Sequence, residues 1–237
     1  MTVTQAQQKH AKRKGSLVTR SRKFVFDSVA KLQLRRNPEL WEHLFQVEAV
    51  TASTGCDFRE YWWLYNYVTS HRPRYILECG AGISTIVMGF AIKELERQGH
   101  PRLTLVSLED VPFYYDDLVK LIPAAVEPYV NIILSEVEDK DFGIGMGRSY
   151  ANVPDHPYEF VFTDGPNLPR GTQLPYFDCD YINIVRRQER PVVGAVDGRK
   201  STCAAYRELF PTAKQRKMHN VGFYYIEASA ADFSDRT

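Results

Sequence analysis

The sequence predicts an α/β protein in which N-terminal helices precede a doubly wound, mostly parallel sheet. Two observations favour this fold class. From residue 74 onward, short apolar runs alternate with stretches of helical periodicity, as expected when helices cover both faces of a parallel sheet. The last two predicted strands are separated by so short a turn that they must pair antiparallel. A chain of 237 residues can bury the core of such a sheet.

Two segments precede the predicted sheet. Residues 1–24 contain seven lysines and arginines and no acidic residue, which is typical of a solvated, flexible arm; contact with phosphates or an acidic partner is the alternative. Residues 25–73 have helical periodicity and form a helical extension, which ends in a helix from Asp57 to Ser70 with Asp57 as its N-cap. The small residues at 51–55 suit a loop that lines a ligand pocket. The sheet domain is therefore expected to span residues 74–237.

The elements of the sheet domain follow in regular alternation. The predicted strands are residues 75–78, 103–108, 130–134, 158–163, 191–196, 214–218 and 222–227. The predicted helices are residues 85–98, a stretch that ends near 121, residues 176–187 and residues 201–210. The glycine-rich residues 143–147 are expected to form a flexible loop, either a lid or plain surface. Right-handed crossovers place the carboxyl ends of the parallel strands, and the functional loops with them, at one edge.

The composition excludes several classes of protein. A formal net charge of +1 creates no overall field that would attract nucleic acid. The four cysteines are too scattered for a zinc site and fit reduced thiols. No apolar run is long enough to cross a membrane, and the first residues lack the apolar core of a secretory signal. We expect a cytoplasmic protein without a membrane partner, and the oligomeric state stays open.

The most informative motif lies where the first strand turns into a helix. Residues 78–85 read Glu-Cys-Gly-Ala-Gly-Ile-Ser-Thr, so a glycine loop brings the backbone close to a ligand and the helix behind it offers free N–H groups. A dinucleotide-binding loop would have a third glycine where this chain has Thr85, and a phosphate loop would continue as Gly-Lys-Ser or Gly-Lys-Thr. Glu78 would repel a pyrophosphate and suits a ligand with an ammonium or sulfonium group.

This motif resembles the first motif of the class I S-adenosylmethionine-dependent methyltransferases, especially the subgroup that reads Glu-x-Gly-x-Gly-x-Ser-Thr. Residues 105–110 resemble the family's second strand, whose terminal acid holds the ribose hydroxyls, and Asp164-Gly165-Pro166 is typical of the subgroup after the fourth strand. The resemblance implies a Rossmann-like fold with S-adenosylmethionine as cofactor. It assigns cofactor binding to Glu78, Gly80, Ala81, Gly82, Ser84, Thr85, Glu109, Asp110, Glu138, Asp139 and Asp164, with Glu138 and Asp139 near the adenine.

Acidic residues also end the predicted strands, whatever the resemblance. Glu78, Glu109, Asp164 and Asp197 all fall at strand ends, so one edge of the sheet would carry four carboxylates. The alternative is that these acids cap the helices that follow them. His156 precedes the fourth strand and is expected at the opposite edge.

Methyl transfer from a sulfonium requires alignment of the acceptor, the methyl group and the sulfur, together with a route for the acceptor's proton. Asp164, Asp197 and Arg199 are therefore the candidate catalytic residues. Arg199 either offsets the local acids or binds an anionic acceptor. Asp164 and Asp197 also match the acids with which catechol-type O-methyltransferases hold a divalent metal. Those enzymes usually have Asp or Asn where this chain has Gly198, so a metal is not favoured.

These observations predict a methyltransferase that O-methylates a small molecule or a sugar-type metabolite. Methylation of nucleic acid or protein, with the basic arm as a docking element, is the first alternative; the Asn-Pro-Pro-Tyr motif of base N-methyltransferases is absent after Asp164, so nucleic acid is disfavoured. A non-catalytic S-adenosylmethionine-binding protein is the second alternative. A nicotinamide dehydrogenase is disfavoured by Glu78 and Thr85.

Overall fold

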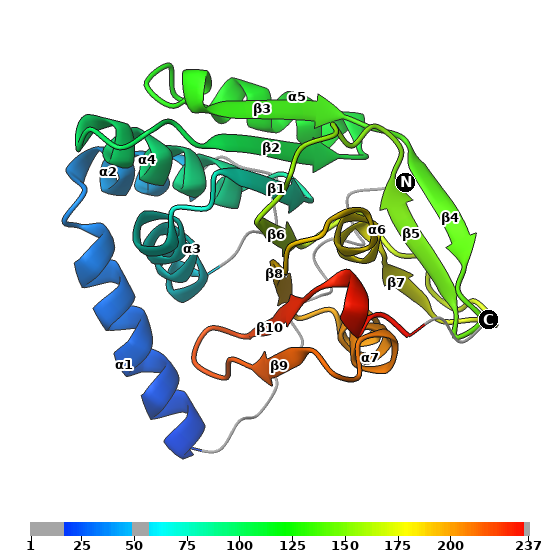
Figure 1. Ribbon diagram of the computed structural model, residues 1–237. Coiled ribbons are helices and arrows are strands. Elements are labelled where there is room, and N and C mark those ends of the chain that lie inside the picture. The colour runs from blue at the N-terminus through cyan, green and yellow to red at the C-terminus, as the bar shows by residue number, and fades with distance from the viewer. Residues whose placement is uncertain (1–16, 49–56, 235–237) are drawn as a thin grey trace.

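The computed structural model describes residues 17–48 and 57–234, and its centre is a seven-stranded sheet in the order β3-β2-β1-β6-β8-β10-β9 (Figure 1). Five neighbouring strands are parallel, whereas β10 runs antiparallel to β8 and β9 pairs antiparallel with β10. The strands are β1 (Tyr75–Cys79), β2 (Thr104–Glu109), β3 (Val130–Leu134), β6 (Phe160–Thr163), β8 (Val192–Asp197), β9 (Lys214–Lys217) and β10 (Phe223–Ala228). This arrangement confirms the predicted mostly parallel sheet with an antiparallel C-terminal pair.

Helices cover both faces of the sheet, as the doubly wound class requires. One face carries α3, α4 and α5 with α1 and α2 packed outside them, and the other carries α6 and α7. The helices are α1 (Leu17–Leu34), α2 (Pro38–Glu48), α3 (Phe58–His71), α4 (Ile83–Arg97), α5 (Pro112–Leu121), α6 (Asp180–Arg187) and α7 (Lys200–Leu209). The described residues also include two short 3₁₀ helices, η3 (Glu127–Tyr129) and η4 (Ala230–Asp232).

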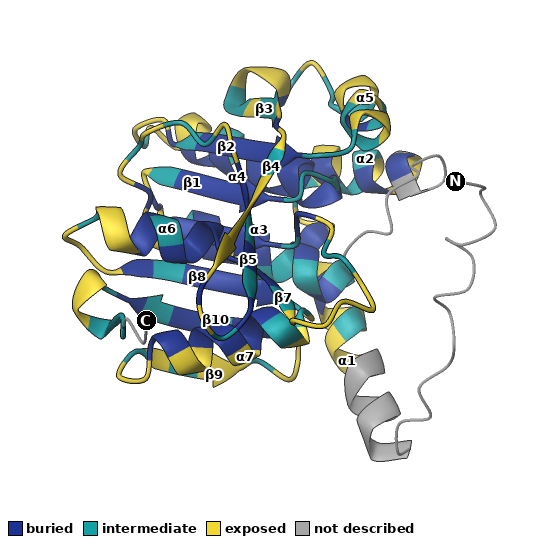
Figure 2. Cartoon of the chain, turned by 90° about the vertical axis from the view of Figure 1, so that its right-hand side faces the viewer, coloured by how far each residue is buried: buried dark blue, intermediate teal, exposed yellow. Residues whose placement is uncertain are grey.

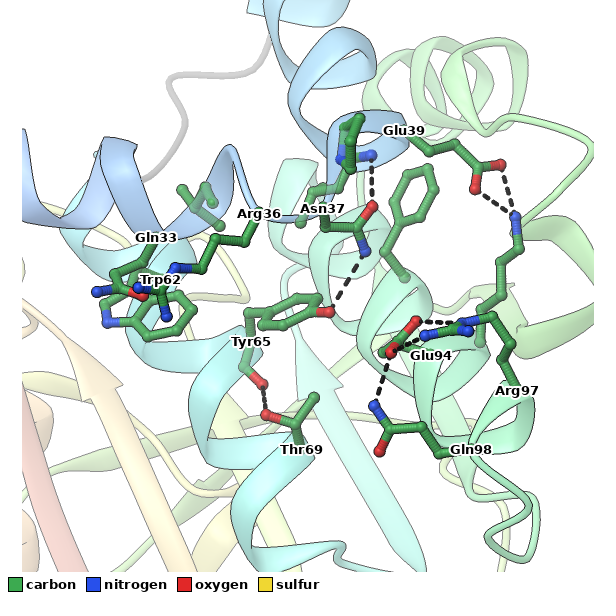
Figure 3. A pocket seen from close by; sticks show the side chains of 15 residues that line it. Gln33, Arg36, Asn37, Glu39, Trp62, Tyr65, Thr69, Glu94, Arg97 and Gln98 are labelled. Carbon is green, nitrogen blue, oxygen red and sulfur yellow. Dashed lines mark hydrogen bonds and ion pairs between the residues drawn. The ribbon is translucent and has the colours of Figure 1, made fainter.

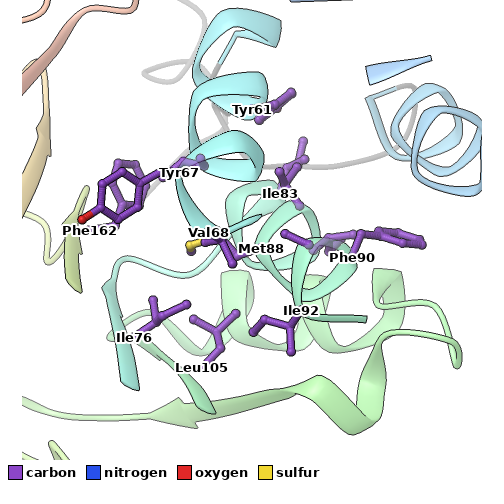
Figure 4. Packing of buried hydrophobic residues seen from close by; sticks show 14 of the residues in the cluster. Tyr61, Tyr67, Val68, Ile76, Ile83, Met88, Phe90, Ile92, Leu105 and Phe162 are labelled. Carbon is purple, nitrogen blue, oxygen red and sulfur yellow. The ribbon is translucent and has the colours of Figure 1, made fainter. Parts of the chain in front are cut away.

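The sheet is buried on both faces, which explains why its strands read as continuous apolar runs. Successive side chains point to opposite sides: Ile76 packs toward α3 and α4, and Leu77 packs toward α6 and α7. Figure 2 shows the central strands almost entirely in the colour of buried residues. On the α4 side, Ile76, Leu105 and Ile92 lie together between the strands and the helix (Figure 4).

Helix α3 has the start and the end that the sequence predicts. Asp57 is its N-cap, and a capping box joins the Asp57 side chain to the backbone of Glu60 and the Glu60 side chain to the backbone of Asp57. The helix ends at Arg72, whose φ of 55° places it in the left-handed region directly before Pro73. The Arg59 side chain then donates to the Asn220 carbonyl at 2.6 Å, which ties α3 to the turn between β9 and β10.

A second, three-stranded sheet corrects two predictions. Its strands are β4 (Val137–Asp141), β5 (Met146–Tyr150) and β7 (Tyr176–Asp178). Residues 143–145 are the turn of a hairpin, and residues 146 and 147 begin its second strand, where the sequence predicts a loop. Residues 176–178 are likewise a strand, and the helix expected from 176 begins at Asp180. Non-local packing decides both: the Phe142 and Phe177 rings meet edge to face at 5.4 Å, and a Cβ on Gly147 would lie 2.4 Å from Phe142.

The N-terminal segments are described only in part. Helix α1 begins at Leu17, so residues 17–24 are helical and not part of the flexible arm that the sequence predicts for 1–24. The remainder of that arm and the predicted pocket loop at 51–55 lie outside the described residues. None of the helices in residues 17–48 and 57–234 combines the length and apolar character that a membrane span needs.

Candidate functional site

The carboxyl ends of four neighbouring strands form one edge of the sheet, where the strand order reverses between β1 and β6. The pairing registers of β2, β1, β6 and β8 are in phase at this edge. The chain positions that follow the last paired residues are therefore aligned across it, and they hold Glu109, Gly80, Asp164 and Asp197. Ligands of open α/β sheets bind at such a reversal. The structure thus brings these four predicted site residues together.

The loop after β1 is held in place by its own amides. Gly80 has a φ of 93°, and the N–H groups of Gly80 and Ala81 both donate to one β2 carbonyl, at 3.0 and 2.8 Å. The N–H of Gly82 donates to Thr85 Oγ1 at 3.1 Å, and that hydroxyl donates to Glu78 Oε2 at 2.5 Å. Thr85 is fully buried beneath the loop, and the neighbouring Ser84 is buried as well. The ligand-facing part of the motif is consequently the half-buried stretch from Gly80 to Gly82.

Glu78 lies beneath this loop and is completely buried. Its Oε2 accepts hydrogen bonds from the Thr85 and Ser107 hydroxyls, whereas Oε1 has no hydrogen-bond partner among the described residues. Burial raises the pKa of Glu78 to about 7, and the hydroxyl hydrogen bonds oppose part of that rise. An orphaned carboxylate oxygen under a glycine loop fits a ligand with positive charge, because such a ligand would compensate for the lost solvation.

We expect Glu78→Gln to stabilise the ligand-free protein above pH 7 and to leave its stability unchanged below pH 4.5. The folded carboxyl has a pKa of about 7 against an ordinary 4.5, so the folded state binds this proton more tightly than the unfolded state. The stability contributed by this proton is complete below pH 4.5 and is lost, by about 3 kcal/mol, as the pH rises through 7. Urea unfolding on both sides of this window measures the effect. An equal gain at both pH values would point to better packing of the amide instead.

Glu109 ends β2 with a carboxylate that is 6% exposed. Its Oε1 accepts the N–H groups of Asp110 and Val111 at 3.0 and 2.9 Å, so one oxygen holds the turn before α5, and α5 itself has no side-chain cap. The other oxygen, Oε2, accepts no hydrogen bond from the described residues and can receive hydroxyl donors from a ligand. Burial raises the pKa of Glu109 to about 7. The neighbouring Asp110 is half-buried at the same edge and accepts the Tyr150 hydroxyl at 3.4 Å.

Three further carboxyl groups gather beside the loops that follow β6 and β8. Burial, and then the charge of Asp197, raise the pKa of Asp164 to about 7 and the pKa of Glu60, on α3, to about 8. Burial also raises the pKa of Asp197 itself. The Asp164 side chain is 41% exposed, so solvent or a substrate reaches it, and its Oδ1 lies 3.7 Å from Arg199 Nε. A carboxyl group that titrates near neutral pH and is open on one side can accept a proton from a reacting group.

Arg199 is bound within the protein. Its Nη1 donates to Asp178 Oδ1 at 2.6 Å and to the Pro166 carbonyl at 2.7 Å, and its Nη2 donates to the Asp164 carbonyl. Asp178 is completely buried and also accepts the Thr202 hydroxyl, and burial raises its pKa to about 6 although Arg199 lowers it. These contacts favour the interpretation that Arg199 offsets the local acids. It holds the backbone that carries Asp164.

Other predicted residues lie outside this row. Glu138 and Asp139 are exposed on β4 of the small sheet. Asp139 forms an ion pair at 2.7 Å with Arg148, whose Nη1 donates to the Asn167 carbonyl in the loop after β6. Because β3 ends at Leu134, the chain has already turned into the small sheet when it reaches them. His156 stacks on Tyr75 at the start of β1, which confirms its place at the opposite edge.

Three further residues also belong to this region, and the sequence did not single out two of them, Asp178 and Glu60. Asp178 comes from a strand that looks like the beginning of a helix, and Glu60 looks like a simple capping residue. Tyr150 comes from β5, and a Cβ on Gly165 would lie 2.5 Å from its hydroxyl oxygen and 2.5 Å from the Cα of Gly80. The Gly-Pro step after Asp164 was the only sequence signal for this close packing.

Neither a metal-binding group nor the main groove of the described residues belongs to this site. No group of three or more His, Cys, Asp or Glu side chains within the described part of the chain is arranged to hold a metal ion. A groove of about 590 Å³ lies between the α1–α2 turn, α3 and α4 (Figure 3). The groove reaches Thr69 and Gln98, near the carboxyl ends of α3 and α4. These helices lead into the amino ends of β1 and β2. The groove therefore opens at the edge of the sheet opposite to the candidate site.

Comparison with known proteins identifies the fold. No protein-family model and no curated protein matches the sequence. The SAH-bound methyltransferase PaMTH1 of Podospora anserina superposes with a TM-score of 0.52 over 80% of this chain and 87% of that chain, at 11% identity. The chain has the class I methyltransferase fold. A precorrin-6y C5,15-methyltransferase of Geobacter metallireducens superposes with a TM-score of 0.43 over 75% of this chain and 90% of that chain, also at 11% identity.

Proposed function

We propose that the protein is an S-adenosylmethionine-dependent methyltransferase that acts on a hydroxyl group of a small molecule or sugar-type metabolite. The observation that carries this proposal is the aligned row of Glu109, Gly80, Asp164 and Asp197 above the buried Glu78. Three features match the charges and hydrogen-bond donors of this cofactor. They are a glycine loop that a ligand can approach closely, the buried Glu78 with an unpartnered oxygen, and the Glu109 oxygen that can accept hydroxyl donors. The shared fold supports the same conclusion.

The residues at the edge can hold the cofactor by complementary chemistry. Glu109 Oε2 would accept the ribose hydroxyls, and the N-terminus of α4, which begins at Ile83, would receive the carboxylate. Glu78 would lie below the loop and compensate the positive charge of the cofactor. The cofactor supplies an activated methyl group when it is bound. The protein's task is then to position the acceptor and to keep water away from it.

Asp164 is the residue that we propose to receive the acceptor's proton. Its pKa of about 7 lets it be ionised at neutral pH and still bind a proton with adequate strength. Arg199 contributes by holding the Asp164 carbonyl, and thus acts as a positioning residue. Asp197 contributes negative charge that keeps the pKa of Asp164 raised.

Calorimetry with S-adenosylhomocysteine tests the binding part of the proposal. We expect Glu109→Gln to raise the Kd by about 10–100-fold, because a charged acceptor for hydroxyl donors is lost. The matched control is Glu189→Gln, which changes an exposed acid before the amino end of β8, at the opposite edge, and should leave the Kd unchanged. Absence of binding by the wild-type protein would end the proposal. An equal effect of both variants would show that Glu109 has no special role.

Transfer itself is tested with a labelled methyl group and fractionated metabolites. We expect label in small hydroxylated compounds, and loss of most of that label with Asp164→Asn while cofactor binding persists. Tight binding without transfer to any fraction would favour a non-catalytic cofactor-binding protein. Label in protein or nucleic acid would favour the alternative acceptors.

A further inference from the structure

Helix α1 has apolar side chains on two opposite faces. Ala30 and Leu34 are buried against the rest of the protein, at 2% and 1% exposure. On the other side, at the i, i+4, i+7 spacing of one helix face, stand Val25, Val29 and Leu32, which are 57%, 45% and 59% exposed. The described residues cover the first face and leave the second open. The second face therefore needs an explanation beyond the packing of the described residues.

The exposed stripe lies on an element that stands out from the protein body. Figure 1 shows α1 running along one side of the molecule, and Figure 2 shows exposed residues along its described part. Phe26, 44% exposed, widens the stripe on one flank. The stripe is thus a continuous apolar surface formed by Val25, Phe26, Val29 and Leu32.

The charge of the chain is strongly divided at this helix. Residues 1–36 contain ten lysines and arginines and one acid, a net charge of +9, whereas the whole chain has +1, so residues 37–237 carry −8. The single acid, Asp27, is paired with Lys31 at 2.9 Å. Arg36 is exposed just beyond the end of the stripe. A stretch with this charge attracts an anionic surface, and the acidic remainder of the chain does not.

We propose that the α1 stripe docks the protein on an anionic lipid surface. An exposed apolar stripe within a strongly basic segment of sequence is the combination with which a helix lies in the interface of a bilayer, with the apolar side chains below the headgroups and the cations among them. From the sequence, no membrane partner is expected, because no apolar run is long enough to span a bilayer. A helix that lies in the surface needs no span. This proposal is independent of methyl transfer.

Two other occupants fit the stripe less well. Nucleic acid would use the cations, but its phosphates give no reason for exposed Val29 and Leu32. A second copy of the chain would pack its own α1 against the stripe. Residues 17–36 carry six cations and one acid, so such a pairing would bring two helices of net charge +5 together. A lipid surface satisfies both the apolar side chains and the charge.

Co-sedimentation of the full chain with vesicles tests this proposal. We expect binding to phosphatidylcholine vesicles that contain phosphatidylserine, little binding to pure phosphatidylcholine, and a decline as the salt concentration rises. The double variant Val29→Ser with Leu32→Ser keeps every charge and should weaken binding at least about tenfold. Arg36→Gln should weaken binding about fivefold. Both variants change exposed side chains, so their thermal unfolding should match that of the wild type.

The matched control is Phe113→Ser with Val119→Ser on α5, whose side chains are 64% and 48% exposed and which should bind vesicles like the wild type. Undiminished binding by the Val29 and Leu32 variant overturns the proposal. Equal binding to neutral vesicles also overturns it. A wild-type dimer in light scattering that becomes a monomer in that variant would assign the stripe to a second copy. Binding to duplex DNA without binding to vesicles would assign the basic segment to nucleic acid.

Discussion

Gly80→Ala is expected to lower the melting temperature by about 10 °C and to abolish cofactor binding, whereas Gly99→Ala lowers it by about 3 °C. Both glycines have positive φ, 93° and 84°, so both variants place an L-residue in the left-handed region at a cost of about 1 kcal/mol. Only at Gly80 is space also missing. A Cβ there would lie 2.6 Å from the Gly165 nitrogen, and nothing lies within 4 Å of one on Gly99.

The larger loss of stability in Gly80→Ala comes from the clash of the new Cβ with the Gly165 backbone, which cannot move away from Gly80 because β1 and β6 are paired. The loops after β1 and β6 follow adjacent paired strands, and a clash of this kind adds about 1–3 kcal/mol. Thermal unfolding of the two variants, together with calorimetry using S-adenosylhomocysteine, separates the clash from the strain. Gly165→Ala should behave like Gly80→Ala, because its Cβ would lie 2.5 Å from the Gly80 Cα. Equal melting temperatures for the Gly80 and Gly99 variants would contradict this explanation.

Arg199→Met is expected to destabilise the protein by about 3–5 kcal/mol above pH 6. The substitution leaves the completely buried Asp178 with the Thr202 hydroxyl as its remaining described partner, and it frees the carbonyls of Asp164 and Pro166. Arg199 lowers the pKa of Asp178, so the stability of the pair is present while Asp178 is ionised and is lost as the pH falls through about 6. The deficit of the variant should accordingly shrink at lower pH.

Urea unfolding of three variants tests this second prediction. Asp178→Asn in the Arg199→Met background removes the unpaired charge and should recover a large part of the lost stability. Arg97→Met is the control, because Arg97 pairs with Glu94 on the surface and its loss should be hardly measurable. A small effect of Arg199→Met, or no recovery in the double variant, would show that the buried pair matters less than its geometry indicates.

The sequence predicted the scaffold of the site well because that scaffold depends on short-range rules. Alternating apolar runs and helical periodicity identify the parallel strands. The acid and glycines at 78–82 mark the turn between the first strand and the helix after it. The row of Glu109, Gly80, Asp164 and Asp197 then follows from the common register of parallel strands. The resemblance also assigned Glu138 and Asp139 to the site, and the structure places both on β4, in the hairpin with β5.

By itself, then, the sequence determined the fold class, the loop from Glu78 to Gly82 and the acids at the strand ends. Local periodicity and the steric freedom of glycine are properties of neighbouring residues. Only the tertiary structure decided that Arg199 is held by Asp178, that Tyr150 packs against the Gly165 loop, and that α1 exposes a second apolar stripe. Each of these outcomes depends on which faces meet across long separations in the chain. An apolar residue in a helical pattern does not reveal whether its face finds a partner.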